Sequence, residues 1–237
     1  MTLLVFTDLD DTLFTSMRKA PPDGSHQPLA FLADGSPISY ASRTQQAWLA
    51  HWQQHAILIP VTARNHDAYR RVHLSFSAHA VINYGGIILN PDGSPDPDWR
   101  DDSAQHAKHS APRLQALAER MHGRRSDLNI RIVEDFGIPF YLVIKSSSGE
   151  ALDDIAAELA AHLTHPGDKL HHNGNNLAVI PGWLDKAHAV AHLLAQYRQQ
   201  YGEIVSIGMG DSRIDLGFMR HCDYLIAPQR SQIVQQW

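Results

Sequence analysis

Residues 3–12, Leu-Leu-Val-Phe-Thr-Asp-Leu-Asp-Asp-Thr, begin with a short apolar run and continue into three carboxylates. The run Leu3–Phe6 is typical of a strand that is buried on both faces, as in a parallel sheet. Asp8 and Asp10 follow it, and side chains two apart in an extended chain point to the same side. Two adjacent carboxylates repel each other, and a divalent cation relieves that repulsion. Because Mg²⁺ prefers such oxygen ligands, this stretch predicts a cation site at the end of a buried strand.

Four further apolar runs end in polar residues in the same way: Ile57–Val61, Ala80–Ile82, Ile204–Ile207 and Tyr224–Ala227. Helical patterns lie between them, with a capping-box sequence at residues 42–45 and an apolar stripe at residues 187–194 that Gly202 can end. Alternating strands and helices predict an α/β fold with a parallel sheet. Ligands of such sheets bind beyond the carboxyl ends of the strands, where Asp8, Thr62 and Asp211 would meet.

The middle of the chain differs in character and predicts an inserted α+β segment at about residues 87–181. Residues 90–112 are rich in Pro, Asp, Gly and Ser and predict a long loop, followed by a helix at residues 112–122 with Pro112 in its first turn. Strands are expected at 131–134, 140–144 and 177–180, and a helix at 152–163. Residues 19–42 are expected to be irregular, with a short hairpin turning at Asp34-Gly35.

Composition excludes several classes of protein. The 237 residues carry a formal charge of −5, which argues against nucleic-acid binding. No apolar stretch approaches the roughly 20 residues of a membrane helix, and the first residues lack the basic region of a signal peptide. The single cysteine, Cys222, excludes an intrachain disulfide and a cysteine-based zinc cluster. The 16 histidines are scattered, and we expect them at surface or partly buried positions. We therefore expect a cytoplasmic protein without nucleic-acid or membrane partners.

Four segments together resemble the signature motifs of the haloacid dehalogenase (HAD) superfamily, in the family's order. They are Asp8-Leu9-Asp10-Asp11-Thr12 for the motif DxDx[TV], Thr62-Ala63-Arg64 for the second motif, Lys186 for the third, and Gly210-Asp211-Ser212-Arg213-Ile214-Asp215 for the fourth, GDSxND. Each alone is a weak signal, whereas the ordered set is specific. Position 214 departs from the pattern, since it is Ile where the family usually has Asn.

The resemblance extends to a branch of the superfamily. The Thr-x-Arg form and Asn83 ahead of the insertion are similar to subfamily IIB, the Cof-type and sucrose-phosphatase-like phosphohydrolases, although Tyr84 interrupts the usual Asn-Gly. This implies a Rossmann-like core formed by residues 1–86 and 182–237. It also implies an α+β cap of the C2 type (C2B) at residues 87–181.

The resemblance implies a role for each core residue. Asp8 would be the nucleophile that forms an aspartyl-phosphate, and Asp10 would move protons to the leaving oxygen and from the attacking water. Thr62 and Lys186 would bind the phosphoryl oxygens. Mg²⁺ would be held by Asp8, the Asp10 carbonyl and Asp211, with Asp215 anchoring its water shell or Lys186. Asp11 has no assigned role.

Substrate-binding residues are harder to assign. Arg64, Asn83, Asn175 and Asn176 are candidates, although Arg64 could instead pair with a core acid and residues 172–175 could simply form a hairpin turn. Other polar residues of the cap could also face the site: Arg131, Lys145, His171, His172 and Asn173. The expected partner is a small phosphorylated molecule, a sugar phosphate foremost, and the expected state is a monomer or homodimer.

The implied activity is a Mg²⁺-dependent phosphatase, and two alternatives remain. A phosphomutase of the phosphomannomutase type shares these motifs, but it needs an anionic clamp in the cap. Here Arg124-Arg125 and Arg131 are the arginines available for one. A catalytically inactive binding module is the second alternative, and the intact catalytic positions argue against it.

Overall fold

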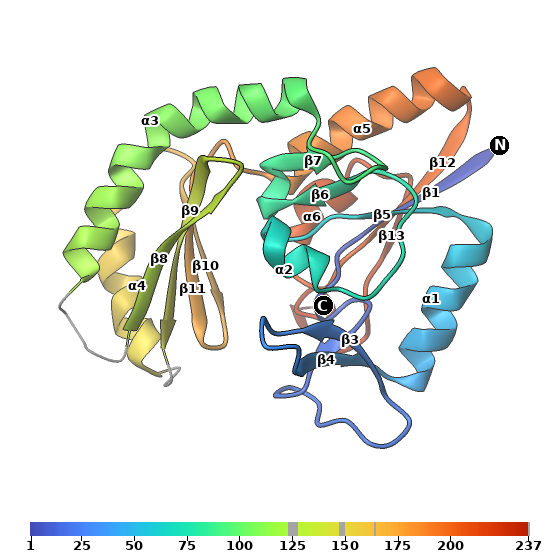
Figure 1. Ribbon diagram of the computed structural model, residues 1–237, viewed down its shortest axis with the longest axis horizontal. Coiled ribbons are helices and arrows are strands. Elements are labelled where there is room, and N and C mark those ends of the chain that lie inside the picture. The colour runs from blue at the N-terminus through green and yellow to red at the C-terminus, as the bar shows by residue number, and fades with distance from the viewer. Residues whose placement is uncertain (123–127, 147–149, 164, 237) are drawn as a thin grey trace. The chain divides into compact units, whose positions relative to one another are not determined.

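The computed structural model describes residues 1–122, 128–146, 150–163 and 165–236, and the chain forms two compact units (Figure 1). The first unit comprises Met1–Pro97 and Asp185–Trp237, and the second comprises Asp98–Leu184. The second unit is thus an insertion in the first. Its bounds differ from the range 87–181 given above because the strand at residues 87–89 pairs within the first unit. Arg124 and Arg125 lie outside the described residues.

A parallel sheet forms the centre of the first unit. Its strand order is β13 (Tyr224–Ile226), β12 (Ile204–Met209), β1 (Thr2–Thr7) and β5 (Ile57–Pro60). The ladder between β1 and β12 runs from Thr2 opposite Ile204 to Thr7 opposite Met209, so both strands end at the same edge. The predicted α/β core with a parallel sheet is therefore confirmed. The carboxyl ends of β1 and β12 carry Asp8 and the segment Gly210–Asp215.

Helices flank this sheet in the first unit (Figure 1). α1 (Arg43–His55) begins at the predicted capping box of Ser42 and Gln45, and its Leu49 and Trp52 join a core cluster with Val5 of β1. α5 (Lys186–Tyr201) begins at the N-cap residue Asp185 and ends at Gly202, as predicted. Two short helices, α2 (His66–Arg70) and α6 (Asp215–Met219), follow β5 and β12. A 3₁₀ turn spans Val234–Gln236.

Two small antiparallel sheets complete the first unit. β2 (Thr15–Ser16), β4 (Pro37–Ala41) and β3 (Gln27–Phe31) form one of them, and Gly35 turns the predicted hairpin with a φ of 82°. Residues 19–42 were expected to be irregular apart from a short hairpin. That hairpin is present as β3 and β4, and β4 also pairs with β2, which lies before this stretch. β6 (Ala80–Ile82) pairs antiparallel with β7 (Ile87–Leu89), and Val81 of β6 forms a parallel bridge with Val61, the residue after β5.

The second unit packs two helices on one antiparallel sheet. α3 (Pro97–Met121) and α4 (Glu150–His162) cover one face of the sheet β10 (Lys169–Asn173), β11 (Asn176–Ile180), β9 (Ile138–Ser146) and β8 (Leu128–Asp135), as Figure 1 shows. Leu114 of α3, Leu152 of α4 and Leu142 of β9 belong to the core cluster between the layers. The hairpin between β10 and β11, predicted as the simpler interpretation of residues 172–175, is confirmed.

Helix α3 corrects the expected loop at residues 90–112. The helix begins at Pro97 and continues through Pro112, which therefore lies inside it rather than in its first turn. Its buried stripe begins with small residues, Ser103, Ala107 and Ser110, before Leu114. Small and polar residues give little hydrophobic periodicity, which is why the pattern did not predict this half of the helix. Among the described residues, no helix combines the length and apolar character needed to cross a bilayer.

Candidate active site

Three carboxylates converge where β1 and β12 end. The backbone N–H of Asp8 donates to the Met209 carbonyl at 2.8 Å, which fixes the two strand ends side by side. Asp8, Asp211 and Asp215 each offer an oxygen, and these atoms all lie within 4.8 Å of one another. All three residues are buried, and Asp215 is fully buried. Close buried carboxylates are costly unless a positive charge compensates them.

Lys186 supplies one such charge from the first turn of α5. Its buried Nζ donates to Asp8 Oδ1 and to Asp215 Oδ1, each at 2.7 Å. Burial opposes the charge of this ammonium, but the two carboxylates outweigh burial and hold the pKa of Lys186 above its usual value. Burial raises the pKa of the Asp8 carboxyl well above its ordinary value, while Lys186 opposes that rise. Lys186 thus offsets part of the cost of burying the Asp8 carboxylate.

The acidic site has more negative charge than Lys186 can offset. Burial, together with the charges of Asp215 and Asp11, raises the pKa of Asp211 to about 7. The charges of Lys186 and Lys19 lower this pKa but do not outweigh burial and the neighbouring carboxylates, and a bound divalent ion would supply further positive charge. Oxygen donors within 4.8 Å of one another are the set that a hard cation such as Mg²⁺ takes. The residues present therefore fit the expected metal.

The fourth-motif segment holds Asp215 in place. Its Oδ2 accepts hydrogen bonds from the Ser212 N–H at 3.0 Å and from Ser212 Oγ at 2.6 Å. A Cβ at Gly210 would lie 2.4 Å from the Asp215 Cβ, so only glycine permits this approach. Ile214, the departure from the family pattern, takes no part in these bonds. Asp215 thus orients Lys186 through one oxygen and the Ser212 turn through the other.

Asp10 faces a different partner. Arg64 Nε donates to Asp10 Oδ2 at 2.8 Å and Arg64 Nη2 donates to Asp10 Oδ1 at 2.7 Å, a bidentate ion pair. The Arg64 guanidinium also lies over the Phe14 ring, 5.4 Å from its centroid. Burial opposes the charge of Arg64, but the bonds to Asp10 raise its pKa above the usual value. Arg64 therefore pairs with a core acid, the alternative to substrate binding named above.

Thr62 and Asn83 are both hydrogen-bonded to the backbone of Arg64. The Arg64 N–H donates to Thr62 Oγ1 at 3.1 Å, and the Asn83 N–H donates to the Arg64 carbonyl at 2.8 Å. Thr62 is 1% exposed and Asn83 is fully buried. Three consecutive residues, Asn83, Tyr84 and Gly85, have positive φ angles of 53°, 56° and 98°. Such backbone is strained for the two non-glycine residues and clusters at functional sites.

One ion pair beside the site was not predicted from the sequence. Lys19, in the loop between β2 and β3, contacts the Asp11 carboxylate, and both charges act on Asp211. Asp11 also has a positive φ of 62°, which turns the chain sharply after Asp10. Sequence offers no spacing rule for a lysine in a loop of this length. The one available signal was the unassigned carboxylate next to the motif.

Asn175 and Asn176 belong to the second unit, in and just after the β10–β11 turn. Asn176 Nδ2 donates to Asn175 Oδ1 at 3.1 Å. Their expected contact with substrate stays a prediction. The structure thus brings together Asp8, Lys186, Asp211 and Asp215 as one cluster, and Asp10, Arg64, Thr62 and Asn83 as a second group within the first unit.

Several solved structures share this arrangement of elements. Sucrose-phosphatase from Synechocystis, solved with sucrose and phosphate, matches all of this chain and 87% of its own at 18% identity and a TM-score of 0.58. The C-terminal domain of C. albicans trehalose-6-phosphate phosphatase matches 93% of this chain and 73% of its own at 10% identity and 0.57.

A haloacid dehalogenase-like hydrolase from Bacteroides thetaiotaomicron matches 95% of this chain and 94% of its own, at 17% identity and a TM-score of 0.50. No protein-family model and no curated protein sequence matches the chain. The protein therefore has the fold of the HAD-type hydrolases. Identities this low establish the fold, while the reaction rests on the residues of the site.

Proposed function

We propose that the protein is a Mg²⁺-dependent phosphatase that hydrolyses small phosphate monoesters through an aspartyl-phosphate on Asp8. One observation carries the proposal: the buried Asp8 carboxylate is bonded to Lys186 and lies within 4.8 Å of the carboxylate oxygens of Asp211 and Asp215. Lys186 balances part of the charge of this nucleophile, and the neighbouring carboxylate oxygens offer ligands for a cation. Two relatives in fold, a sucrose-phosphatase and a trehalose-6-phosphate phosphatase, support a sugar phosphate as the substrate class.

The proposed reaction has two steps, formation of the aspartyl-phosphate and its hydrolysis. In the first, an Asp8 oxygen attacks phosphorus, the bond to the leaving oxygen breaks, and Asp10 donates a proton to that oxygen. In the second, Asp10 takes a proton from water, the water oxygen attacks phosphorus, and the bond to Asp8 breaks. Mg²⁺ at Asp8 and Asp211 would neutralise the charge of the phosphoryl oxygens. Lys186 and the Thr62 hydroxyl would bind those oxygens.

The ion pair with Arg64 bears on the proton transfer in this scheme. Both oxygens of Asp10 accept N–H groups from Arg64, which fixes the plane of the carboxylate. Each oxygen keeps a second lone pair for proton transfer. We therefore assign Arg64 the role of orienting Asp10 toward the leaving oxygen.

Replacing Asp8 by Asn tests the proposed function. The amide keeps the shape of the side chain but is a poor nucleophile, so the rate of p-nitrophenyl phosphate hydrolysis should fall by about 10³-fold or more. Asp34→Asn is the matched control, because Asp34 is an exposed aspartate of the β3–β4 turn. Circular dichroism of both variants should match the parent. Activity of Asp8→Asn near the parent level would refute the nucleophile.

Metal dependence is tested on the unaltered protein. EDTA should stop phosphate release and excess Mg²⁺ should restore it, because Asp211 and Asp8 need a cation to hold the phosphoryl group. Turnover that continues after exhaustive chelation would show that the reaction does not need a metal.

A further inference from the structure

A cavity of about 320 Å³ lies in the first unit beside the turn that follows β1. Its walls come from Thr12 in that turn, from the first turns of α1, and from the residues at and after the end of β13. Met209, the last residue of β12, also lines it. Neither Asp8 nor Asp211 does, so the cavity is separate from the proposed metal ligands. Its volume lies at the lower end of the range of small-molecule sites, roughly 300–1,000 Å³.

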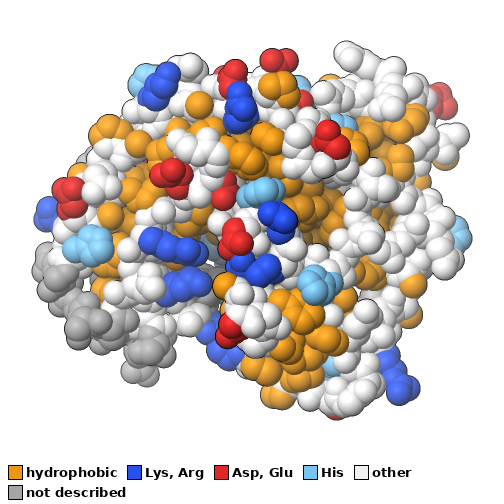
Figure 2. All heavy atoms as spheres, in the orientation of Figure 1, with side chains coloured by type: hydrophobic (Ala, Val, Ile, Leu, Met, Phe, Trp, Pro, Cys, Tyr) orange, Lys and Arg blue, Asp and Glu red, His pale blue; other side chains and the backbone are white. Residues whose placement is uncertain are grey.

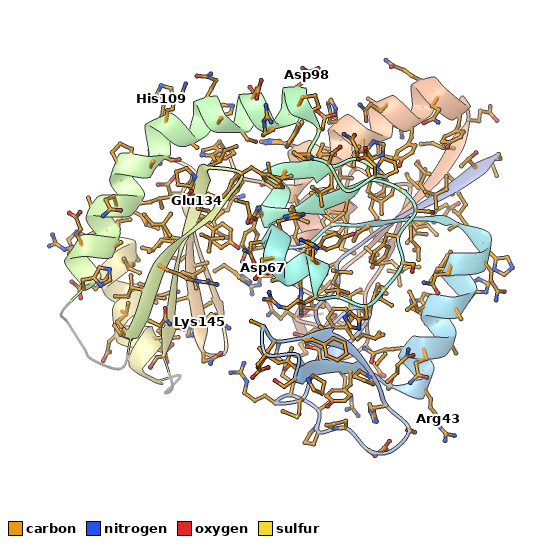
Figure 3. The ribbon with its side chains drawn as sticks, viewed as in Figure 1. Arg43, Asp67, Asp98, His109, Glu134 and Lys145 are labelled. Carbon is orange, nitrogen blue, oxygen red and sulfur yellow. The ribbon has the colours of Figure 1, made fainter. Side chains whose placement is uncertain are left out.

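The lining of this cavity carries no charge. Apart from Thr12, its polar residues are Thr44 and Gln45 of α1 and Gln229 in the segment after β13. Arg43 precedes Thr44, but it is exposed and points outward from the start of α1 in Figure 3. Over α1, Figure 2 shows mostly uncharged side chains on the face in view. Because an ion is costly to remove from water without a counter-charge, this lining favours an uncharged ligand.

An exposed tryptophan contributes an aromatic ring to the lining. Trp48 is 38% exposed, and its ring lies edge-on to that of Trp52, with centroids 5.2 Å apart and an interplanar angle of 87°. Trp52 belongs to the buried core cluster, so this contact holds the Trp48 ring in place. Ile226 and Pro228 add apolar groups to the same lining. A fixed indole beside apolar side chains is a surface on which another aromatic ring packs favourably.

Thr12 brings an unpaired hydroxyl group to the cavity. The residue is 7% exposed, and its Oγ1 has no hydrogen-bond partner among the residues that the structure describes. A buried hydroxyl without a partner costs free energy. Rotation about χ1 exchanges the hydroxyl and the methyl group of a threonine, so this hydroxyl can turn toward the cavity without breaking a hydrogen bond. A carbonyl oxygen on a ligand would accept a hydrogen bond from it.

Two backbone hydrogen bonds connect the wall of the cavity to the catalytic cluster. The Asp8 N–H donates to the Met209 carbonyl at 2.8 Å, and the Gly210 N–H donates to the Ile226 carbonyl at 3.2 Å. Both acceptors belong to residues that line the cavity. A ligand that packs against Met209 and Ile226 therefore restrains the strand ends that carry Asp8 and Asp211.

We propose that this cavity binds a small uncharged aromatic molecule with a carbonyl oxygen, and that binding restrains the catalytic cluster. The ring of the ligand packs on Trp48, and its carbonyl oxygen accepts a hydrogen bond from the Thr12 hydroxyl. The ends of β1 and β12 then lose part of their motion. The inference goes beyond the proposed function and does not depend on it, because the cavity and its hydrogen bonds are present whether or not Asp8 attacks phosphorus.

Benzamide and benzoate are a matched pair of probes, because they share the ring and differ in charge. When benzamide is titrated into the ¹⁵N-labelled protein, the amide resonances of Trp48, Met209 and Ala227 should shift, with a Kd on the order of 1 mM. Benzoate should bind at least about tenfold more weakly, since the cavity offers it no cation. Equal affinities for the two probes, or no shift at these residues with benzamide, would overturn the proposal.

Two variants test the residues that recognise the ligand. Trp48→Leu removes the ring, and Thr12→Val removes the hydroxyl with little change of shape, so each should weaken benzamide binding by about fivefold or more. Tyr201→Leu is the control, since Tyr201 of α5 is 42% exposed and does not line the cavity. Circular dichroism of all three should match the parent. Benzamide affinity that both lining variants leave intact would refute the assigned contacts.

The stability of Thr12→Val gives a check that needs no ligand. The variant should be at least as stable to urea as the parent, because valine replaces an unpaired buried hydroxyl. A clear loss of stability would show that the hydroxyl already has a partner in the free protein, which contradicts its proposed role.

Hydrogen exchange tests the restraint of the strand ends. Saturating benzamide should slow the exchange of the Asp8 and Gly210 amides, because their acceptor carbonyls belong to residues of the cavity wall. The Leu32 N–H, which donates to the Ser36 carbonyl at 2.8 Å in the β3–β4 turn, should exchange at an unchanged rate. If benzamide binds but both amides exchange as before, the coupling to the catalytic cluster is refuted.

Discussion

The ion pair between Arg64 and Asp10 joins the end of β5 to the end of β1 through two hydrogen bonds of 2.7 and 2.8 Å. Such a bidentate pair fixes the carboxylate plane as well as its position. Replacing Arg64 by Ala should therefore lower kcat by about 10²-fold with a smaller effect on KM. Free guanidinium chloride should restore part of the loss, because it can fill the same space and donate in the same geometry.

Arg64→Lys serves as the companion variant. Lysine keeps the positive charge but cannot form the bidentate pair with Asp10, so kcat should stay low. If Arg64 instead binds substrate, KM rises for both variants and guanidinium rescue changes KM rather than kcat. Steady-state kinetics with p-nitrophenyl phosphate distinguish the two roles.

Asp211 gives the metal-free protein a dependence of stability on pH. Burial and two neighbouring carboxylates raise its pKa in the folded protein to about 7, from an ordinary value of 3.8. Between these values the folded state binds more protons than the unfolded state, so the free energy of unfolding falls as pH rises through the window. Asp211→Asn lacks this titration. In EDTA, the stability of the parent minus that of the variant should decrease from pH 4 to pH 7, measured by urea unfolding.

Mg²⁺ should reverse this trend. The cation and the proton compete for the same carboxylates, so the stability that Mg²⁺ adds should grow as pH rises. The variant should show little of that gain. A parent-minus-variant difference that is flat or increases with pH in EDTA contradicts the raised pKa of Asp211.

Motif spacing placed Asp8, Lys186, Asp211 and Asp215 correctly as neighbours, because each follows a strand end or opens a helix at one sheet edge. The contact between Lys19 and Asp11 escaped prediction, since a loop side chain is placed by folding and not by any periodic rule. Arg64 was predicted only in part. Its nearness to the site was predictable, but its choice of Asp10 as a partner was decided by three-dimensional packing.

Among the elements, the 3₁₀ turn Asn83–Gly85 connects β6 to the start of α5 in space. A Cβ at Gly85 would lie 2.4 Å from the Asp185 carbonyl oxygen, and Asp185 is the N-cap residue directly before Lys186. Gly85→Ala should therefore lower the free energy of unfolding by about 3 kcal/mol or more. It should also reduce activity, because the start of α5 must shift.

Gly35→Ala is the matched control for that change. Gly35 also has a positive φ, of 82°, but nothing lies within 4 Å of the added Cβ. Its substitution should cost only the backbone strain, about 1 kcal/mol, and leave activity intact. Equal losses of stability in both variants, measured by chemical denaturation, would show that the contact with Asp185 does not contribute to the free energy of unfolding.

Elements with large apolar side chains were predictable and those with small ones were not. α1 and α5 matched their predicted caps because the Ser42 side chain caps the start of a helix and Gly202 adopts the positive φ that ends one. The first half of α3 was missed because its buried stripe consists of serine and alanine. Pro112 misled the prediction further, since proline usually marks a helix start or break, and here the helix continues through it.

For the whole molecule, every residue proposed to hold Mg²⁺ lies in the first unit, and none lies on the sheet of the second unit. The motifs predicted which residues of the first unit would meet, because residues at strand ends recur at fixed places in the fold. The helix-free face of the second unit could not be predicted in the same way. It depends on which residues of four strands fall opposite each other, and register is set by the bulge and turns.

Because the proposed metal ligands all lie in the first unit, we predict that Mg²⁺ protects the backbone of that unit from hydrogen exchange. Hydrogen–deuterium exchange with and without Mg²⁺ should show slower exchange at the backbone around residues 8–12 and 210–215, because the cation ties together the ends of β1 and β12. Strands β8 to β11 should exchange at unchanged rates, since none of them contributes a carboxylate to the cluster. The Asp211→Asn variant should lose the protection. Protection that appears mainly in β8–β11 would place the metal in the second unit and contradict the assignment.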